Sequence, residues 1–227
     1  MLGELLRDEE VLFSAWLTLK VAAVCLALHL VTAVPLAVWA RSPKAPFRRT
    51  LNFVVTLPLV FPPIALGYML LMALGQTGLG EPLQRLFGAR LIFSQAAVVL
   101  AAYIAGLPLV IKPIQAALGG ETARKLTEAA RVTGAGPVAA FVLVVIPLIR
   151  TSLAVGLLLG VTRSFGEVGI SLMLGGNISQ RTNTLSLEVF NAVSRGDFER
   201  ATALCVLLAC ISLCLYLAID HLQRRKA

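Results

Sequence analysis

Few residues in this chain of 227 have the types and spacing that catalysis or metal binding requires. Only two histidines occur, His29 and His221, and no histidine, cysteine and carboxylate cluster has metal-ligand spacing. No Gly-x-x-x-x-Gly-Lys-Ser/Thr sequence is available to hold nucleotide phosphates. The sequence therefore predicts no catalytic residue, no metal site and no cofactor bound by this chain. The cysteines lie in apolar runs without CxxC spacing and are expected to be buried small hydrophobic residues: Cys25, Cys205, Cys210 and Cys214.

The composition indicates a membrane protein with almost no soluble part. Hydrophobic residues make up 58% of the chain and charged residues only 14%, whereas globular domains are about one quarter charged. The mean hydropathy is +0.85. A crossing needs about 20 apolar residues, so this length leaves no room for a separate catalytic or ligand-binding domain. The net charge of +8 comes largely from basic residues flanking apolar runs, which reports membrane orientation and predicts no nucleic-acid partner.

Five apolar runs are expected to cross the membrane as helices of one domain that covers residues 1–227. The expected spans are about 11–40, 51–74, 91–111, 138–161 and 201–219. His29, inside the first run, is expected to pack against a neighbouring helix. The stretch 168–174 is apolar but too short to cross, which predicts a re-entrant or half-buried segment within 165–176.

The distribution of basic residues predicts the orientation of these spans. Segments 41–49, 112–131 and 224–226 are rich in lysine and arginine, which cytoplasmic loops retain. The residues before the first span are net acidic. Five spans therefore place the N-terminus outside and the C-terminus in the cytoplasm.

Polar residues and prolines at membrane depth are the candidates for lining a pathway. Three prolines within six residues of the second span must kink or break a helix, and freed carbonyls are tolerated against protein or a watered cavity. A merely bent helix is the alternative. At the outer end of the fourth span, Arg163 and Glu167 are four residues apart, so a structural ion pair is an alternative to a ligand contact. The candidate residues are Thr56, Pro58, Pro62, Pro63, Ser164 and Glu167.

The segment 119–137 has a different character from the apolar runs. Helix-favouring residues follow Gly119 and Gly120, and Glu121 can pair with Lys125, which predicts a short helix over 121–134. Gly134 suits the helix C-terminal cap. A helix this short is marginal in water, so we expect it to be held by a partner. An ordinary linker between spans is the alternative.

Within this segment, Glu128-Ala129-Ala130, then Gly134 and later Pro147, resembles the EAA loop of bacterial ABC importer permeases. Val144 and Ile146 stand where the family pattern usually has Ile and Leu. The resemblance implies an all-α permease of the type I importer class, with a cytoplasmic coupling helix that inserts into a cleft on a separate ATPase subunit. The residues implied in that contact are Leu126, Glu128, Ala129, Ala130, Arg131 and Gly134.

Other motifs resemble those of molybdate permeases and together cover nearly the whole chain. They are Leu57-Pro58-Leu59-Val60-Phe61-Pro62-Pro63, Gly67-Tyr68-Met69-Leu70-Leu71, Ser164-Phe165-Gly166-Glu167-Val168-Gly169, Gly175-Gly176-Asn177-Ile178 and Thr182-Asn183-Thr184-Leu185. The resemblance implies molybdate import across the cytoplasmic membrane by alternating access, and permeases for tungstate or sulfate are the close alternatives. It also implies a homodimer, two ATP-binding cassette subunits that carry ATP and Mg²⁺, and an external oxyanion-binding protein that selects the substrate.

Two other classes remain as competing hypotheses. A secondary transporter or channel commonly shows internal repeats or intramembrane carboxylates, and this sequence has no evident repeat and only Glu167 near membrane depth. An integral membrane enzyme would need a catalytic constellation, which the sequence lacks. Co-purification with an ATPase would separate the importer from both.

Overall fold

The computed structural model describes residues 7–41, 45–76, 78–88, 90–132, 134 and 136–224, and every regular element in these ranges is a helix. The elements are α2 (Glu9–Arg41), α3 (Arg48–Val60), α4 (Pro63–Leu74), α5 (Gly80–Phe87), α6 (Gln95–Gly119), α7 (Glu121–Val132), α8 (Pro137–Ala140), the π-helix η1 (Phe141–Val145), α9 (Ile146–Phe165), α10 (Gly169–Gly175), α11 (Leu185–Ser194) and α12 (Phe198–Arg224). Within the described ranges, three stretches have the length and hydropathy to cross a membrane: Glu9–Ala40, Gln95–Gly119 and Phe141–Phe165.

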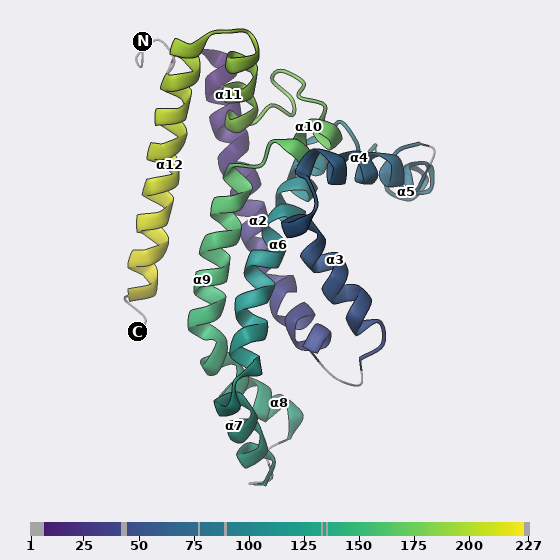
Figure 1. Ribbon diagram of the computed structural model, residues 1–227, viewed down its shortest axis with the longest axis vertical. Coiled ribbons are helices and arrows are strands. Elements are labelled where there is room, and N and C mark those ends of the chain that lie inside the picture. Colours follow the sequence, from purple (N-terminus) through teal and green to yellow (C-terminus); the bar gives the residue numbers. More distant parts are fainter. Residues whose placement is uncertain are drawn as a thin grey trace.

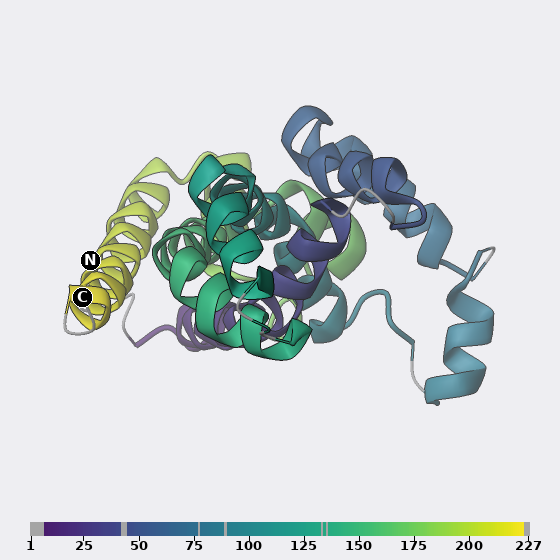
Figure 2. The ribbon, with the colours of Figure 1, turned by 90° about the horizontal axis from the view of Figure 1, so that it is seen from below.

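Helices α2, α6 and α9 run side by side and form the centre of the molecule (Figures 1 and 2). Glycines allow α6 and α9 to approach closely: a Cβ added at Gly106 would lie 2.7 Å from the carbonyl oxygen of Gly160. At Gly156, an added Cβ would lie 3.0 Å from Cα of Val110. Helix pairs in membranes associate through such small-residue contacts, because burying apolar surface gains nothing against lipid.

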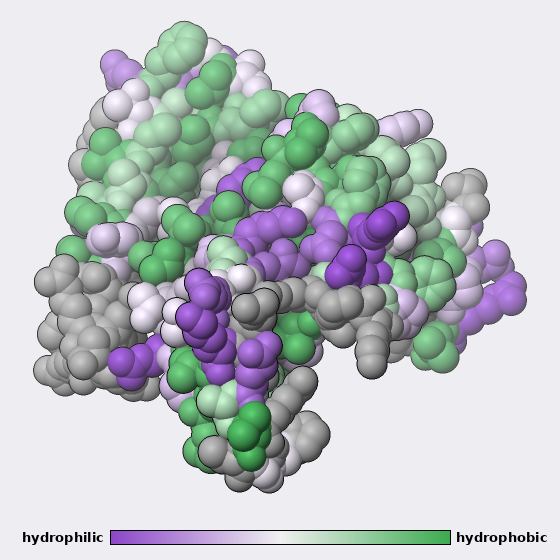
Figure 3. Space-filling view, turned by 60° about the horizontal axis from the view of Figure 1, so that its bottom comes forward, coloured by the Kyte–Doolittle hydropathy of each residue, from purple (hydrophilic) through white to green (hydrophobic). Residues whose placement is uncertain are grey.

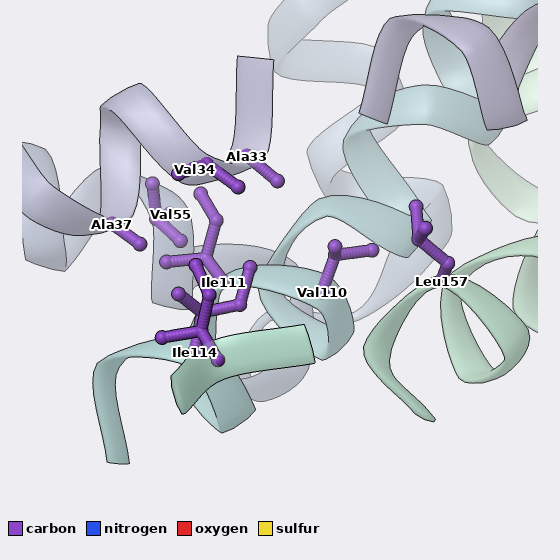
Figure 4. Close-up of a cluster of buried hydrophobic side chains, with 9 residues drawn as sticks. Ala33, Val34, Ala37, Val55, Val110, Ile111, Ile114 and Leu157 are labelled. Carbon is purple, nitrogen blue, oxygen red and sulfur yellow. The ribbon is translucent and has the colours of Figure 1, made fainter. Parts of the chain in front are cut away.

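Apolar side chains from four helices fill the space beside this contact (Figure 4). The buried cluster comprises Ala33, Val34 and Ala37 of α2, Val55 of α3, Val110, Ile111 and Ile114 of α6, and Ile149 and Leu157 of α9. Nearer the outer end of this core, His29 is fully buried, stacks on Tyr103 with ring centroids 4.8 Å apart, and donates from Nε2 to the Tyr103 carbonyl oxygen over 3.1 Å. As expected, this histidine packs against a neighbouring helix.

The segment 51–74, expected as one span, is two helices that meet at Phe61–Pro62. The peptide N–H of Phe61 makes the last bond of α3, to the carbonyl oxygen of Leu57 at 2.8 Å. Pro62 and Pro63 have no N–H to continue that ladder, and Phe61 and Pro62 are extended, with ψ values of 141° and 129°. Helix α4 then runs across the end of the bundle instead of prolonging α3 (Figure 1).

Other boundaries also differ from the expected ones. Helix α6 begins at an N-cap, Ser94, whose side chain accepts from the N–H of Ala97, and it continues through Pro113 to Gly119, past the expected end at 111. The connection after α4 contains the short helix α5. The stretch 168–174 folds largely as α10, which is too short to cross and packs against α4 and α6.

The expectation that all four cysteines are buried is wrong for three of them. Cys25 is buried, whereas Cys205, Cys210 and Cys214 are exposed on α12. Helix α12 contacts α11 and α9 along one side only, so its remaining sides are left to the surroundings. In an apolar environment an exposed small apolar side chain carries no penalty.

The two ends of the bundle differ in their elements (Figure 1). One end, here called the inner end, carries α7, α8 and the start of α3. The opposite, outer end carries the start of α2 together with α4, α10 and α11, and α12 runs from the outer end back toward the inner one. The inner end therefore includes the start of α3, the end of α6 and α7, which carry basic residues of the segments 41–49 and 112–131, in agreement with the orientation predicted from the sequence.

Candidate functional site: the coupling helix and the permeation elements

Helix α7 is a separate short helix attached directly to the end of α6. Gly119 ends α6, Gly120 is extended with φ −65° and ψ 154°, and α7 begins at Glu121. Glu121 and Lys125 form an ion pair of 2.8 Å whose side chains are 70% and 68% exposed. Such an exposed pair contributes at most about 1 kcal/mol. The helix is held mainly by its contacts with α6, α8 and η1.

The residues predicted to contact an ATPase lie on α7 or just after it. Leu126 is 45% exposed, Glu128 and Ala129 are exposed, and Ala130 is half-buried. Gly134 has φ 81° and open space around its Cβ position, as a left-handed cap requires. Arg131 is part of α7, but its side chain lies outside the described residues. Val132 is 87% exposed, so this polar end of the molecule presents large apolar side chains, which commonly mark an interaction site.

Beyond α7 the chain returns to the bundle through a widened helical turn. The N–H of Ile146 bonds to the carbonyl oxygen of Phe141, five residues back, which closes the π-helix η1. Pro147 follows within the first turn of α9. Proline has no N–H, so within a regular helix it would leave one backbone carbonyl oxygen without its hydrogen bond. Helix α7 is therefore joined to α6 by one residue and to α9 by α8 and η1. A displacement of α7 acts on both central helices.

The predicted pathway residues of the second span lie around the break between α3 and α4. Thr56 donates from Oγ1 to the carbonyl oxygen of Asn52 at 2.6 Å, Pro58 is half-buried inside α3, and Pro62 and Pro63 are exposed at the break. Helix α10 packs against this break, because a Cβ added at Gly169 would lie 2.8 Å from Cβ of Pro63.

The predicted polar residues of α9 are engaged with their own chain. Ser164 donates from Oγ to the carbonyl oxygen of Gly160 at 2.9 Å. The Glu167 side chain is 1% exposed: Oε1 accepts from the N–H of Ile170 at 2.7 Å, and Oε2 lies 2.8 Å from the Arg163 guanidinium. The ion pair considered in the sequence is thus present, and Glu167 also caps the start of α10. A role for Ser164 or Glu167 in the pathway stays a prediction.

Sequence reasoning missed a buried polar network at the outer end, between α2, α11 and the loop before α11. Five polar residues close together in sequence are less than 9% exposed: Thr182, Asn183, Thr184, Ser186 and Glu188. Asn183 donates to Glu188, and Thr18 of α2 accepts at Oγ1 from the N–H of Leu185 at 2.9 Å. Burial raises the pKa of Glu188, and the nearby Glu10 carboxylate adds to the rise. The sequence feature that could have indicated an ordered segment here is Thr184, a threonine at a helix N-cap position directly before an apolar run.

Comparison with known proteins identifies relatives along nearly the whole chain. The sequence model of the family described as binding-protein-dependent transport system inner membrane component matches residues 33–227. The chain is 34% identical over 212 residues to the molybdenum transport system permease protein ModB of Azotobacter vinelandii, covering 93% of each chain. It is 35% identical to the protein of that name from Escherichia coli K12, covering 80% of this chain and 81% of the relative.

A more distant relative and a solved structure complete the comparison. Sulfate permease 2, chloroplastic, of Chlamydomonas reinhardtii is 32% identical over 206 residues, which cover 91% of this chain and 56% of that protein. A subunit of a bacterial alginate ABC transporter, solved in complex with an alginate-bound periplasmic protein, superposes with a TM-score of 0.78. That match covers 98% of this chain and 81% of the other at 19% identity, so it bears on the fold alone.

Proposed function

The chain belongs to the family of binding-protein-dependent transport system inner membrane components, and from that premise we propose that it is the membrane subunit of an ATP-driven molybdate importer. The predicted class, an ABC importer permease with an all-α fold, is confirmed by the family match and by the likeness to a solved transporter subunit. In this family the membrane component is distinct from the ATPase, so the chain is a non-enzymatic subunit. It is a multi-pass membrane protein.

Helix α7 is the single observation that carries the mechanism. It bears the Glu128-Ala129-Ala130 motif, lies outside the bundle at the inner end, and is joined to α6 through Gly120 and to α9 through α8 and η1. An ATPase subunit that binds α7 and changes conformation would move the adjoining ends of α6 and α9 together. Because α6 and α9 touch through glycines, they would transmit this motion as a unit over the length of the bundle.

The break between α3 and α4 is the second element of the proposed mechanism. Helix α4 lies across the outer end and is packed on α10, which is itself anchored to α9 through Glu167. A movement of α9 therefore reaches α4 and the extended residues Phe61 and Pro62. We place the outer gate of the pathway at this break, lined by Thr56, Pro58, Pro62 and Pro63.

The assembly that we propose is a permease homodimer with two ATP-binding cassette subunits, which carry ATP and Mg²⁺, and an external oxyanion-binding protein. Exposed apolar side chains on α4 provide surface for a second copy, including Ile64 and Met69. The Arg163 guanidinium is neutralised by Glu167. The pathway would thus pass a released dianion without a fixed cation to trap it.

Uptake by reconstituted vesicles tests the proposal directly. Vesicles would contain the permease and its ATPase with ATP enclosed, and the binding protein would be supplied outside with labelled molybdate. We expect molybdate uptake that requires both ATP and the binding protein. Uptake without the ATPase would instead indicate a secondary transporter or channel.

A sulfate permease is the second candidate, because the chloroplastic sulfate permease is 32% identical over most of this chain. Competition separates the two. Excess tungstate should suppress molybdate uptake, since the two dianions have nearly the same size, whereas sulfate should have little effect. Strong inhibition by sulfate would favour the second candidate, and the affinities of the binding protein for the three anions would decide.

A further inference from the structure

A cavity of about 480 Å³ opens at the inner end between α2, α3 and α6, and none of the predicted pathway residues lines it. Its lining residues are Ala40, Arg48, Arg49, Asn52, Gln115 and Gly119. Figure 3, which brings this end forward, shows hydrophilic side chains gathered in a band with apolar surface on either side. Among the residues that the structure describes, no carboxylate lines the cavity, although arginines on protein surfaces are commonly accompanied by acidic partners.

The two arginines are available to a ligand. Arg48 is half-buried and Arg49 is exposed, and within the described part of the chain neither guanidinium forms an ion pair. Arg48 and Arg49 carry ten N–H donors between them, and two like charges at one cavity are stabilised by an anion. Planar guanidinium groups donate pairs of parallel N–H bonds to the oxygens of a phosphate or a carboxylate, so the expected ligand is an oxyanion.

The neutral residues of the cavity are held in place by hydrogen bonds. Asn52 donates from Nδ2 to the carbonyl oxygens of Ala40, at 2.7 Å, and Arg48, at 3.1 Å. Gln115 donates from Nε2 to Oδ1 of Asn52 at 2.9 Å. These bonds tie α2, α3 and α6 together around the cavity. These side chains are therefore already ordered before any ligand binds, which lowers the entropic cost of binding.

Exposed apolar residues adjoin the arginines in sequence and indicate that the ligand also has an apolar part. Phe47, immediately before α3, is 81% exposed, and Phe53 and Val54 on the same helix are 66% and 55% exposed. The arginines thus lie at the start of a helix whose further surface is apolar. A ligand that satisfies both surfaces has an anionic phosphate head and hydrocarbon tails. Basic pockets between helices at the cytoplasmic side of a membrane bind such lipid headgroups.

We propose that the cavity lined by Arg48, Arg49, Asn52 and Gln115 binds the phosphate of an anionic phospholipid from the inner leaflet. The bound headgroup neutralises the paired guanidinium groups, and its acyl chains lie against the apolar surface of α3. Because Gly119 also lines the cavity, the lipid occupies the joint between α6 and α7. Lipid binding at this cavity does not depend on the identity of the transported anion.

Thermal unfolding of the purified full-length chain in detergent tests the proposal. Dioctanoyl-phosphatidylglycerol at about ten times its Kd should raise the midpoint by roughly 3–5 °C. Zwitterionic dioctanoyl-phosphatidylcholine should raise it much less. The Arg48→Gln/Arg49→Gln variant should lose the shift, and Arg48→Lys/Arg49→Lys should keep part of it because the charge remains. As a matched control, Arg85→Gln/Arg90→Gln removes two charges elsewhere and should keep the full shift.

Three outcomes would overturn the proposal. An undiminished shift with phosphatidylglycerol in the Arg48→Gln/Arg49→Gln variant would place lipid binding elsewhere. Inorganic phosphate that protects as well as the lipid at equal concentration would overturn the lipid assignment and indicate a site for a free anion. Native mass spectrometry of the same variants should show loss of one retained phosphatidylglycerol per chain in the glutamine variant only, and equal retention would also contradict the site.

Discussion

The outer end of the molecule and helix α7 satisfy their polar groups in different ways. At the outer end, Asp8 pairs with Arg200 at 2.7 Å, Glu10 accepts from Ser179 at 2.8 Å, and Asn183 donates to the buried Glu188. The first two of these bonds join segments that are far apart in sequence. On α7, by contrast, the ion pair between Glu121 and Lys125 lies within one turn of the helix and is exposed, and large apolar residues such as Val132 face outward.

This difference supports the proposal that the outer end is held together by the chain itself, whereas α7 is completed by another protein. A buried polar network costs 1–3 kcal/mol for each partner that is removed, so the outer end should govern stability. An exposed short helix contributes little to stability on its own, so changes on α7 should affect coupling and leave folding intact. The following predictions separate these two effects.

The largest expected effect follows from added volume at the C-terminal cap of α7. Gly134→Trp should reduce uptake and stimulated ATP hydrolysis by about 5- to 150-fold, because overpacking a docked surface costs about 1–3 kcal/mol. Gly134→Ala is the matched control: it introduces the same left-handed strain at φ 81° without the bulk. Ala130→Trp should act as Gly134→Trp does. Both rates are measured in vesicles, together with a pull-down of the ATPase, and normal values for Gly134→Trp would make α7 a linker.

The second effect concerns stability at the outer end. Asn183→Leu removes the side chain that donates to the buried Glu188 carboxylate, and should lower the midpoint of thermal unfolding by roughly 3–10 °C. Transport per folded molecule should remain near that of the wild type. Ser179→Ala, which removes an exposed hydrogen bond to Glu10, should lower the midpoint far less. A loss of coupling at unchanged stability in Asn183→Leu would contradict the division between the two ends.

The third effect tests the element that lies between the two ends. Pro62→Ala/Pro63→Ala restores two backbone donors and should favour a continuous helix across Phe61. Membrane insertion should be intact, and uptake should fall by a few-fold because α4 can no longer lie freely across α10. Uptake at the wild-type rate would show that the prolines serve packing only.

The smallest effect is a pH dependence at the outer end. Burial opposes ionisation of Asp8, but its hydrogen bond and charge interaction with Arg200, together with backbone N–H donors, outweigh it and lower the pKa below the ordinary 3.8. The stabilisation from this carboxylate is therefore complete above about pH 5 and is lost as the pH falls through the lowered pKa. Asp8→Asn should destabilise by less than about 1 kcal/mol at neutral pH. The difference from the wild type should vanish in acid, and a constant difference down to pH 3 would contradict this assignment.

The sequence identified α7 well because its features are local. Gly119 and Gly120 stop one helix, Glu121 and Lys125 support the next, and Gly134 ends it with a positive φ. Each feature depends on neighbours within about four residues, which a sequence displays directly.

The break at Phe61 and the outer network depended on contacts between distant segments. Three prolines indicated a kink or break but did not determine the direction of α4, which is set by packing on α10 through Gly169. Likewise, no local sequence pattern indicates that the polar residues Thr182 and Glu188 are buried. Both are buried because Thr18 and other residues of α2 lie against that loop and its helix, a contact across more than 160 residues that no local pattern reports.

The most direct test of the account measures whether α7 is covered by the ATPase. In a chain whose exposed cysteines Cys205, Cys210 and Cys214 are replaced by serine, Leu126→Cys would report on α7 and Phe190→Cys on α11 at the outer end. Both positions are exposed, at 45% and 41%, so both should react with a maleimide in the isolated permease. Addition of the ATPase subunit should slow labelling at 126 several-fold and leave labelling at 190 unchanged. Equal labelling rates at 126 with and without the ATPase would contradict the claim that this helix couples the permease to ATP hydrolysis.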